Sequence, residues 1–582
     1  MQDRQRWVDE KLGAMDVAQK VGQLMVFGFC GPVITPDTVD LIRHHHLGGL
    51  RISQGFRIIN LFNDVKPGTE PEEWTLRSLH PPAGPNRDFG GLRHPTYCTP
   101  AEYAGVLNRL RQIALDRPGG VPLHFTVDQE GSASDDLLFG MRLLPHPMGL
   151  AASGDPANAY LAARTISSMA RALGVNMIHS PVLDVNTNPR NPEVGTRAFS
   201  DDTELVSRFA LESLRGFNDG GLIATGKHFP GRGESVADAH WGLPVADPAR
   251  EALERIHIAP YRELIAQDLP AIMMAHCRYP ALSASADPAS CDPVIVRDYL
   301  RGELGFDGVI STDNMMMGGL LQRYELSEAV LRVLQAGCDL VLLRDESPIR
   351  WRILERIIEA VHSGAYPEAQ LDESVARILA MRHRMGLAEN GGLVDVDAAD
   401  RFNDPAVVAA ADKLAEDCTL LVRDEAETLP IAPDAKVLLV EQVFPTQERL
   451  NNLYGHPGLL WDEMGRFSQR VASVEISNVP TEQDVQRVRR RLAEDDYDVI
   501  VSTNYYYHKA ASSNTPMVEE MLATGRPVVV VSNTIYDFGV PPQLPCAITS
   551  FNPGGREHMR VVAEALYGKR QLTASLPVTR RS

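Results

Sequence analysis

The first 390 or so residues alternate short apolar runs with stretches that show helical spacing of apolar residues, such as 157–173, 204–217 and 328–336. Strands of a parallel sheet are covered on both faces, so they read as continuous apolar runs. Eight runs of this kind occur, at 23–29, 48–53, 123–128, 176–185, 223–229, 271–277, 308–313 and 340–343. The repeat predicts an α/β fold, a (β/α)8 TIM-like barrel, whose site lies at the carboxyl ends of the strands.

A chain of 582 residues is too long for one ordinary core, so a second domain is expected. The barrel is predicted over 1–388, followed by a polar linker at 389–404 and a smaller α/β layered (sandwich) domain over 405–582. A helical run at 406–418 opens that domain, and its strand candidates, expected to be parallel, lie at 436–441, 473–478, 498–502, 527–532 and 547–551.

One stretch does not fit the barrel repeat. Residues 54–99 are rich in proline and charge and show no sustained period, which predicts an insertion after the second strand. Loops that follow barrel strands lie on the face of the site, so the insertion either forms one wall of a pocket or is a surface loop.

Bulk composition limits the partners and the compartment. A net charge of −19 and a pI near 5.4 argue against nucleic acid or an anionic membrane surface. No apolar run approaches the ~20 residues that span a bilayer, and residues 1–10 are too polar for a signal peptide. Seven scattered cysteines predict reduced thiols and a cytoplasmic protein. No phosphate-binding or metal-binding spacing occurs, so neither cofactor nor metal is predicted; the oligomeric state stays open, a homodimer included.

The segment 227–240 combines several groups that can do chemistry. Lys227 and His228 end an apolar run, a Pro-Gly-X-Gly turn follows, and the segment closes on Asp238 and His240. A lysine beside a histidine offers donors to a polar ligand, and a carboxylate can orient a nearby imidazole and make it more basic. The pattern predicts a strand that leads into a loop with a proton-transfer dyad.

This segment resembles the Lys-His-Phe-Pro-Gly-His-Gly…Asp-Ser-His loop of glycoside hydrolase family 3, in its bacterial β-N-acetylhexosaminidase branch. Further stretches resemble motifs of the same family, in the same order: 127–131, 180–185, 191–199, 275–276 and 308–314. The resemblance covers most of the first 390 residues and, more weakly, the remainder. It implies a carbohydrate substrate and a two-domain glycosidase.

Retaining glycoside cleavage needs a carboxylate on one face of the anomeric carbon and a proton donor on the other. Asp313, at a strand end, is expected to be the nucleophile, which is its position in the family. The resemblance implies that His240, held by Asp238, acts as the acid and base. It also implies that the sugar contacts come from Asp128, Arg197, Lys227 and His228. His276 is expected either to line the pocket or to be buried in a hydrogen bond, and Asp184 to be structural.

The chain also departs from the family pattern. Residues 132–136 replace an arginine-containing segment with one that includes Asp135 and Asp136. If Asp136 faces the pocket, a cationic or differently substituted sugar is favoured; Arg142 could restore the lost charge from a shifted position. Arg232 replaces a histidine of the loop, and this substitution is expected to be mild.

Three functions are open at this point. The first is an exo-acting, retaining β-N-acetylglucosaminidase that acts on cell-wall or chitin fragments, in cell-wall recycling. The second is a related enzyme with another sugar specificity, or with phosphate as the acceptor, because a histidine acid adds no second negative charge beside the site. The third is a carbohydrate-binding or sensory protein that has lost catalysis, although the presence of both Asp238 and His240 argues against it.

Overall fold

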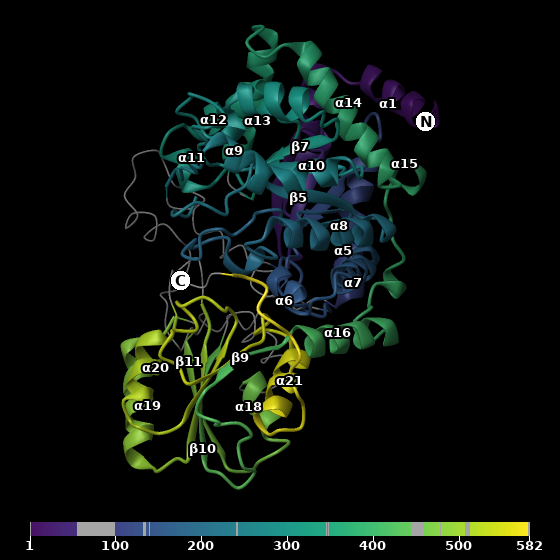
Figure 1. Ribbon diagram of the computed structural model, residues 1–582. Helices are drawn as coiled ribbons and strands as arrows, with labels where there is room; N and C mark the ends of the chain where they lie inside the picture. The colour runs from purple at the N-terminus through teal and green to yellow at the C-terminus, as the bar shows by residue number, and fades with distance from the viewer. Residues whose placement is uncertain are drawn as a thin grey trace.

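A computed structural model describes the protein (Figure 1). The described residues are 2–54, 99–131, 135–138, 140–239, 242–344, 346, 348–443, 458–477, 479–506 and 513–579. The predicted insertion at 54–99 therefore lies almost wholly outside the described residues, and so does His240.

The amino-terminal part is a parallel barrel, as predicted. Its strands are hydrogen-bonded in the order β7-β6-β5-β4-β3-β2-β1-β8. A parallel bridge between Ser311 and Leu340 brings the β8 segment beside β7 and closes the ring. The strands are β1 Met25–Cys30, β2 Gly49–Ser53, β3 His124–Val127, β4 Met177–Ile178, β5 Ile223–Phe229, β6 Ala271–Met274, β7 Val309–Thr312 and β8 Val341–Leu343.

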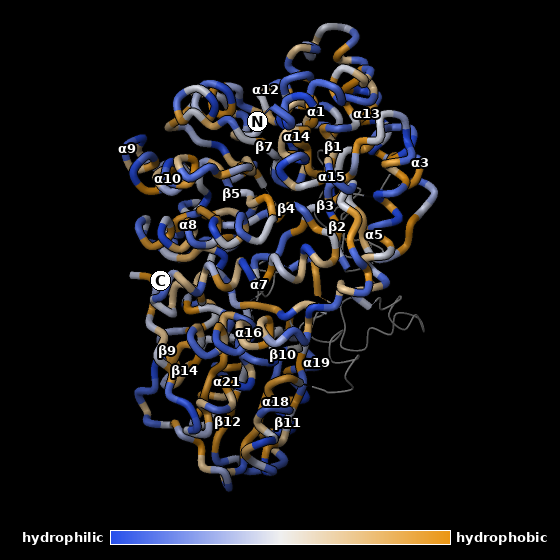
Figure 2. The backbone as a smooth tube through the Cα atoms, turned by 90° about the vertical axis from the view of Figure 1, so that its right-hand side faces the viewer, coloured by the Kyte–Doolittle hydropathy of each residue, from blue (hydrophilic) through white to orange (hydrophobic). Residues whose placement is uncertain are grey.

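Helices surround the barrel, and several begin at residues whose side chains cap the first turn of the helix. At α8 the side chain of Asp202 accepts the backbone N–H of Leu205, and at α5 Thr99 and Glu102 form a capping box. In Figure 2 these helices alternate blue and orange along the chain, as expected of helices with one face on a core. The helices are α1 Gln2–Gly13, α2 Val17–Gln23, α3 Pro36–His44, α5 Pro100–Leu115, α6 Pro147–Ala152, α7 Ala157–Leu173, α8 Thr203–Asp219, α9 Arg250–Ala252, α10 Ala259–Ile265, α11 Gly318–Leu321, α12 Leu326–Ala336, α13 Ile349–His362, α14 Glu368–Arg384 and α15 Leu387–Asn390.

A second, six-stranded sheet follows, in the order β11-β10-β12-β13-β14-β9. The five predicted strands pair in parallel, while β9 joins β14 in antiparallel orientation and was not predicted. We keep the domain limits 1–388, 389–404 and 405–582 as a proposal. The elements are α16 Pro405–Cys418, β9 Leu420–Asp424, β10 Val437–Val443, α18 Leu459–Met464, β11 Val471–Ser477, α19 Glu482–Glu494, β12 Val499–Asn504, α20 Thr515–Leu522, β13 Val528–Ser532, β14 Cys546–Thr549 and α21 Arg556–Leu566.

The two sheets are joined by side chains as well as by the chain. Asn186, in the loop after β4, donates to the hydroxyl of Tyr536 at 2.6 Å, and Asn552 donates to the carbonyl of Leu143 at 2.7 Å. Helix α16 lies between the two parts in Figure 1, and several of its apolar residues belong to the barrel core. The second sheet is thereby held against the loops that follow β3 and β4.

Two further findings concern the environment of the chain. In the described part of the chain, no helix is both long and apolar enough to cross a membrane. The six cysteines among those residues are all buried.

Candidate active site

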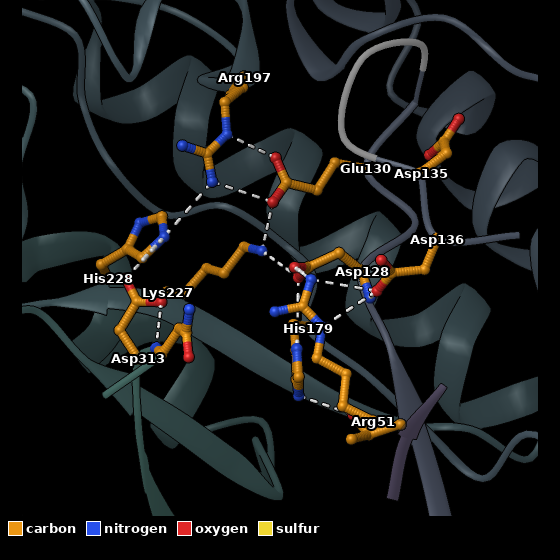
Figure 3. A network of polar contacts seen from close by, with 12 residues as sticks. Arg51, Asp128, Glu130, Asp135, Asp136, His179, Arg197, Lys227, His228 and Asp313 are labelled. Atoms are coloured by element: carbon orange, nitrogen blue, oxygen red, sulfur yellow. Dashed lines mark hydrogen bonds and ion pairs between the residues drawn. The ribbon is translucent and has the colours of Figure 1, made fainter. Parts of the chain in front are cut away.

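The predicted site residues lie at the carboxyl ends of the barrel strands. Asp128 directly follows β3, Asp313 directly follows β7, and His276 follows β6 by two residues. Lys227 and His228 are consecutive in β5, where the pairing register with β6 shifts between Lys227 and Phe229. Such an irregularity changes the direction in which side chains point, and it allows both Lys227 and His228 to join the polar cluster inside the barrel mouth (Figure 3).

Two buried cations and two buried carboxylates form the first part of this cluster. The Nζ atom of Lys227 lies 2.8 Å from Oδ1 of Asp128 and also contacts Glu130. Arg197 donates to both carboxylate oxygens of Glu130, at 2.7 and 3.0 Å. Burial alone would raise the pKa of Glu130, but the charges of Arg197 and Lys227 outweigh it and bring the pKa to about 2. These side chains present a fixed array of charges and donors.

Asp136, in the altered segment after Gly131, lies beside cationic side chains. Asp136 is buried and bound by Arg51 of β2, whose Nε lies 3.1 Å from Oδ2, so it is not available to a cationic sugar. Arg51 also contacts Asp128. Arg142 pairs instead with Glu557 of the second domain, and thus does not restore charge to the site. The positive charge beside Asp136 comes from Arg51 and from Arg344, 3.4 Å away.

Asp313 is held as a charged carboxylate. Its Oδ1 accepts the backbone N–H of Asn314 at 2.7 Å, and its Oδ2 lies 3.2 Å from Nη1 of Arg232 and 3.9 Å from Nε2 of His228. Burial would raise the pKa of Asp313, but the charges of His228, Arg232 and His276 and the N–H of Asn314 lower it far below the usual range. The side chain therefore carries a negative charge over the whole physiological pH range.

Arg232, which was expected to be a mild replacement, makes direct contacts within the cluster. Its guanidinium is buried, contacts Asp313, and forms an ion pair with Glu193. Its backbone N–H donates to Oδ1 of Asp184 at 2.7 Å, while Oδ2 of Asp184 lies 2.7 Å from Nδ1 of His228. Asp184 thus fixes both the loop and the ring of His228.

His276 is buried in a hydrogen bond, one of the two roles predicted for it. Its Nδ1 lies 2.8 Å from the hydroxyl of Ser290, and burial lowers its pKa below the ordinary histidine value. Its charge when protonated still acts on Asp313. The side chain is therefore part of the surroundings of Asp313.

The loop that carries the predicted dyad is described up to Ala239. Asp238 is buried; burial lowers the pKa of Arg232, but the charges of Asp313, Asp184 and Asp238 together raise it above the ordinary value. The backbone N–H of Ala239 donates to Oε2 of Glu193 at 3.3 Å. His240, the other member of the predicted dyad, lies outside the described residues, so the pairing of Asp238 with His240 stays a prediction.

Several residues of the cluster were not among those predicted. Glu130 and Glu193 lie within recognised motifs, and Arg51 is a charged residue inside an apolar strand, which is a signal for an inward-facing charge. His179 follows β4, and its Nδ1 lies 3.3 Å from Asp128. Among the described residues no group of three or more His, Cys, Asp or Glu side chains is arranged to hold a metal ion.

A small cavity, partly open to solvent, adjoins this cluster. The loop after β4 supplies Glu193 and Arg197, and the second domain supplies an aromatic wall of Tyr506 and Phe538, whose ring centroids are 4.0 Å apart. The hydroxyl of Tyr506 donates to the carbonyl of Pro192 at 3.4 Å. The second domain therefore reaches a cavity that shares residues with the barrel cluster.

The chain was compared with proteins of known sequence and structure. A "Beta-N-acetylglucosaminidase/beta-glucosidase" of Cellulomonas fimi is 32% identical over 382 residues, which are 64% of this chain and 64% of that protein. "Beta-hexosaminidase A" of Pseudoalteromonas piscicida is 27% identical over 377 residues, 60% of this chain and 63% of that protein. The matches thus span just under two thirds of these relatives.

Solved structures match over a longer part of the chain. A glycoside hydrolase family 3 beta-N-acetylglucosaminidase from Paenibacillus sp. str. FPU-7 has a TM-score of 0.81 at 29% identity and covers 97% of this chain and 99% of that one. A beta-glucoside phosphorylase has a TM-score of 0.78 at 20% identity, covers 99% of this chain and 97% of that one, and shows a shared fold. Residues 16–381 match the "Glycosyl hydrolase family 3 N terminal domain". The chain therefore belongs to glycosyl hydrolase family 3.

Proposed function

We propose that the protein is a retaining exo-β-N-acetylglucosaminidase. The observation that carries the proposal is the carboxylate of Asp313, held by Arg232 and by the N–H of Asn314 beside a fixed array of polar and charged groups at the barrel mouth. The similarity to the Cellulomonas fimi and Paenibacillus enzymes, named for this activity, supports the same sugar.

Asp313 is the nucleophile of this mechanism. An oxygen of its carboxylate attacks the anomeric carbon, and the bond from that carbon to the leaving oxygen breaks, which forms a covalent glycosyl-enzyme. Water then attacks the same carbon from the opposite face and releases Asp313 as a carboxylate. Because Asp313 is held ionised, it needs no base to activate it.

The acid and base of the mechanism are His240 and its partner Asp238. Protonated His240 gives its proton to the leaving oxygen in the first step and takes a proton from water in the second. An imidazole with a pKa near ~6.5 does both at neutral pH without a large shift. The support is the sequence of the loop and the burial of Asp238.

The remaining cluster binds the sugar and fixes its ring. Asp128 and Glu130 accept from sugar hydroxyls, while Lys227, Arg197 and His228 donate to them. Because these side chains already hold one another through ion pairs, they lose little freedom when the sugar binds. His276 is hydrogen-bonded to Ser290; it acts on Asp313 through its charge and does not contact the sugar.

Water is favoured over phosphate as the acceptor. Lys227 is paired with Asp128 and Glu130. Arg232 is paired with Asp313 and Glu193. Arg197 holds Glu130 through two hydrogen bonds. Phosphate at neutral pH carries one to two negative charges and would meet a carboxylate beside each of these three cations. The charge balance therefore favours the hydrolase.

The cavity between the barrel and the second domain takes the leaving group. It combines an aromatic wall with polar groups, and it begins at Arg197 beside the sugar-binding cluster. A second sugar of a chitin or cell-wall fragment suits such a lining. We propose a role in cell-wall recycling in the cytoplasm, in keeping with the scattered positions of the seven cysteines in the sequence.

A panel of aryl glycosides tests the proposal. N-acetylglucosamine, glucosamine, glucose and xylose glycosides are compared with and without phosphate, with Asp313→Ala as the control for contaminating activity. The expected result is cleavage of the N-acetylglucosaminide, unchanged by phosphate and lost in the variant. Phosphate-dependent turnover would indicate the phosphorylase, and sugar binding without turnover of any glycoside would indicate a binding protein.

A further inference from the structure

Arg232 lies between two acidic side chains that come from different loops. Its Nη1 is 3.2 Å from Oδ2 of Asp313, which follows β7, and its Nη2 contacts Oε1 of Glu193, which lies in the loop after β4. All three are buried or nearly so, and the backbone of Arg232 is fixed by Asp184. Two carboxylates therefore hold the guanidinium of Arg232, and a third holds its backbone N–H.

Glu193 has a second partner. Its Oε2 accepts the backbone N–H of Ala239 at 3.3 Å, and its Oε1 lies 4.0 Å from Nη1 of Arg197. One carboxylate therefore connects the loop after β5, which contains Ala239, to the guanidinium that contacts Asp313. A change at Glu193 is expected to reach Asp313 mainly through Arg232, which touches both carboxylates.

The other charged groups that face Asp313 are titratable. His228 of β5 lies 3.9 Å away, and His276, after β6, acts on it from a buried position. A guanidinium, unlike an imidazole, stays charged at every working pH. Arg51 of β2 is also cationic, but Asp128 and Asp136 act on it more strongly than Asp313 does. Arg232 is thus the permanent cation in contact with Asp313.

We propose that Arg232 is a positioning residue that fixes the orientation and charge of Asp313, and that Glu193 sets the position of Arg232. This inference rests on the proposed function. In the second step the bond between the anomeric carbon and Asp313 breaks, and its electron pair returns to the carboxylate; water supplies the new oxygen, and its proton goes to the loop base. Because a charge-assisted hydrogen bond stabilises the returning carboxylate, Arg232 favours release of the sugar.

The pH dependence of kcat/KM for an aryl N-acetylglucosaminide tests this role. Without the permanent cation, Asp313 takes up a proton at higher pH, so Arg232→Gln is expected to move the acidic limb of kcat/KM upward by about one pH unit or more. Because release of the sugar becomes slower, kcat is expected to fall by about 100-fold. Arg232→Lys keeps the positive charge but loses the planar guanidinium, so its acidic limb and its rate should lie between those of the wild type and Arg232→Gln. Glu193→Gln is expected to shift the same limb by less than Arg232→Gln does.

Controls separate this role from a loss of folded protein. Arg255→Gln, at an exposed position, should leave the limb unchanged, and thermal unfolding reports the folded fraction of every variant. An active wild type together with an Arg232→Gln limb that does not move would overturn the inference and leave the proposed function intact. Absence of turnover by the wild type on every glycoside of the panel would overturn both.

Discussion

The Nζ atom of Lys227 lies 2.8 Å from Oδ1 of Asp128, and the two side chains come from strands β5 and β3, with β4 between them. Neither charge has much access to solvent, and Glu130 and Arg51 extend the pair on either side. Strands that are distant in sequence thus deliver opposite charges to one edge of the barrel, where a sugar can be bound through several hydroxyls at once.

Replacing Lys227 by methionine tests this pair. The change leaves two buried carboxylates with one cation fewer, so the free energy of unfolding should fall by about 3 kcal/mol, and kcat/KM should fall about 100-fold. Urea denaturation and aryl-glycoside kinetics measure the two effects. In the control Lys413→Met, an exposed pair with Asp417 is lost, and stability should change by less than about 1 kcal/mol. Equal effects in the two variants would contradict the role of Lys227.

Asp135 predicts a pH dependence of stability. Burial and the charges of Glu130 and Asp136 raise its pKa to about 8 in the folded protein, against the hydrogen bond from Gly131, while an unfolded aspartate titrates near ~3.9. Folding therefore favours the protonated form. The stabilisation is complete below about pH 4 and is lost as the pH rises through about 8.

The variant Asp135→Asn removes this dependence. We compare the free energy of unfolding of the variant with that of the wild type by urea denaturation. The difference in favour of the variant should be larger at pH 8 than at pH 4 by at least about 1 kcal/mol. Asp298→Asn, at an exposed position, serves as the matched control and should follow the wild type. If Asp135→Asn and the wild type show the same dependence between pH 4 and pH 8, the raised pKa is wrong.

The aromatic wall of the cavity predicts a selective effect on longer substrates. Phe538→Ala removes a ring that lines the cavity beside Tyr506, so KM for an N-acetylglucosamine disaccharide should rise about fivefold to tenfold. KM for an aryl N-acetylglucosaminide should change less, because its leaving group fills less of the cavity. Leu576→Ala, on the surface, is the control. Equal changes for both substrates would show that the cavity does not bind the second sugar.

Much of the fold followed from hydrophobic pattern. Seven of the eight barrel strands were predicted within a few residues because parallel strands are apolar on both faces and end at polar side chains, whereas β4 ends at Ile178, well before the predicted limit of 185. Strand β9 was missed: it pairs at the edge of its sheet in the opposite direction, and the exposure of Leu421 weakens its apolar pattern. The sequence motifs led directly to Asp128, Lys227, His228 and Asp313.

The contacts within the cluster could not be predicted in the same way. Arg232 and Asp313 are 81 positions apart, so nothing local in the sequence indicates that they touch. Arg142 lies in the segment that looked suited to restore charge, yet the approach of the second domain gives it Glu557 as a partner. Charge pairing across loops depends on tertiary packing, which a single sequence does not show.

The identity of the nucleophile is tested most directly by trapping the covalent intermediate. The protein is incubated with 5-fluoro-N-acetylglucosaminyl fluoride, digested, and its peptides are weighed by mass spectrometry. We expect one added fluorosugar on the peptide that contains Asp313, and none in Asp313→Ala. A fluorosugar bound to Asp128 or Glu130, or steady turnover by Asp313→Ala, would contradict it.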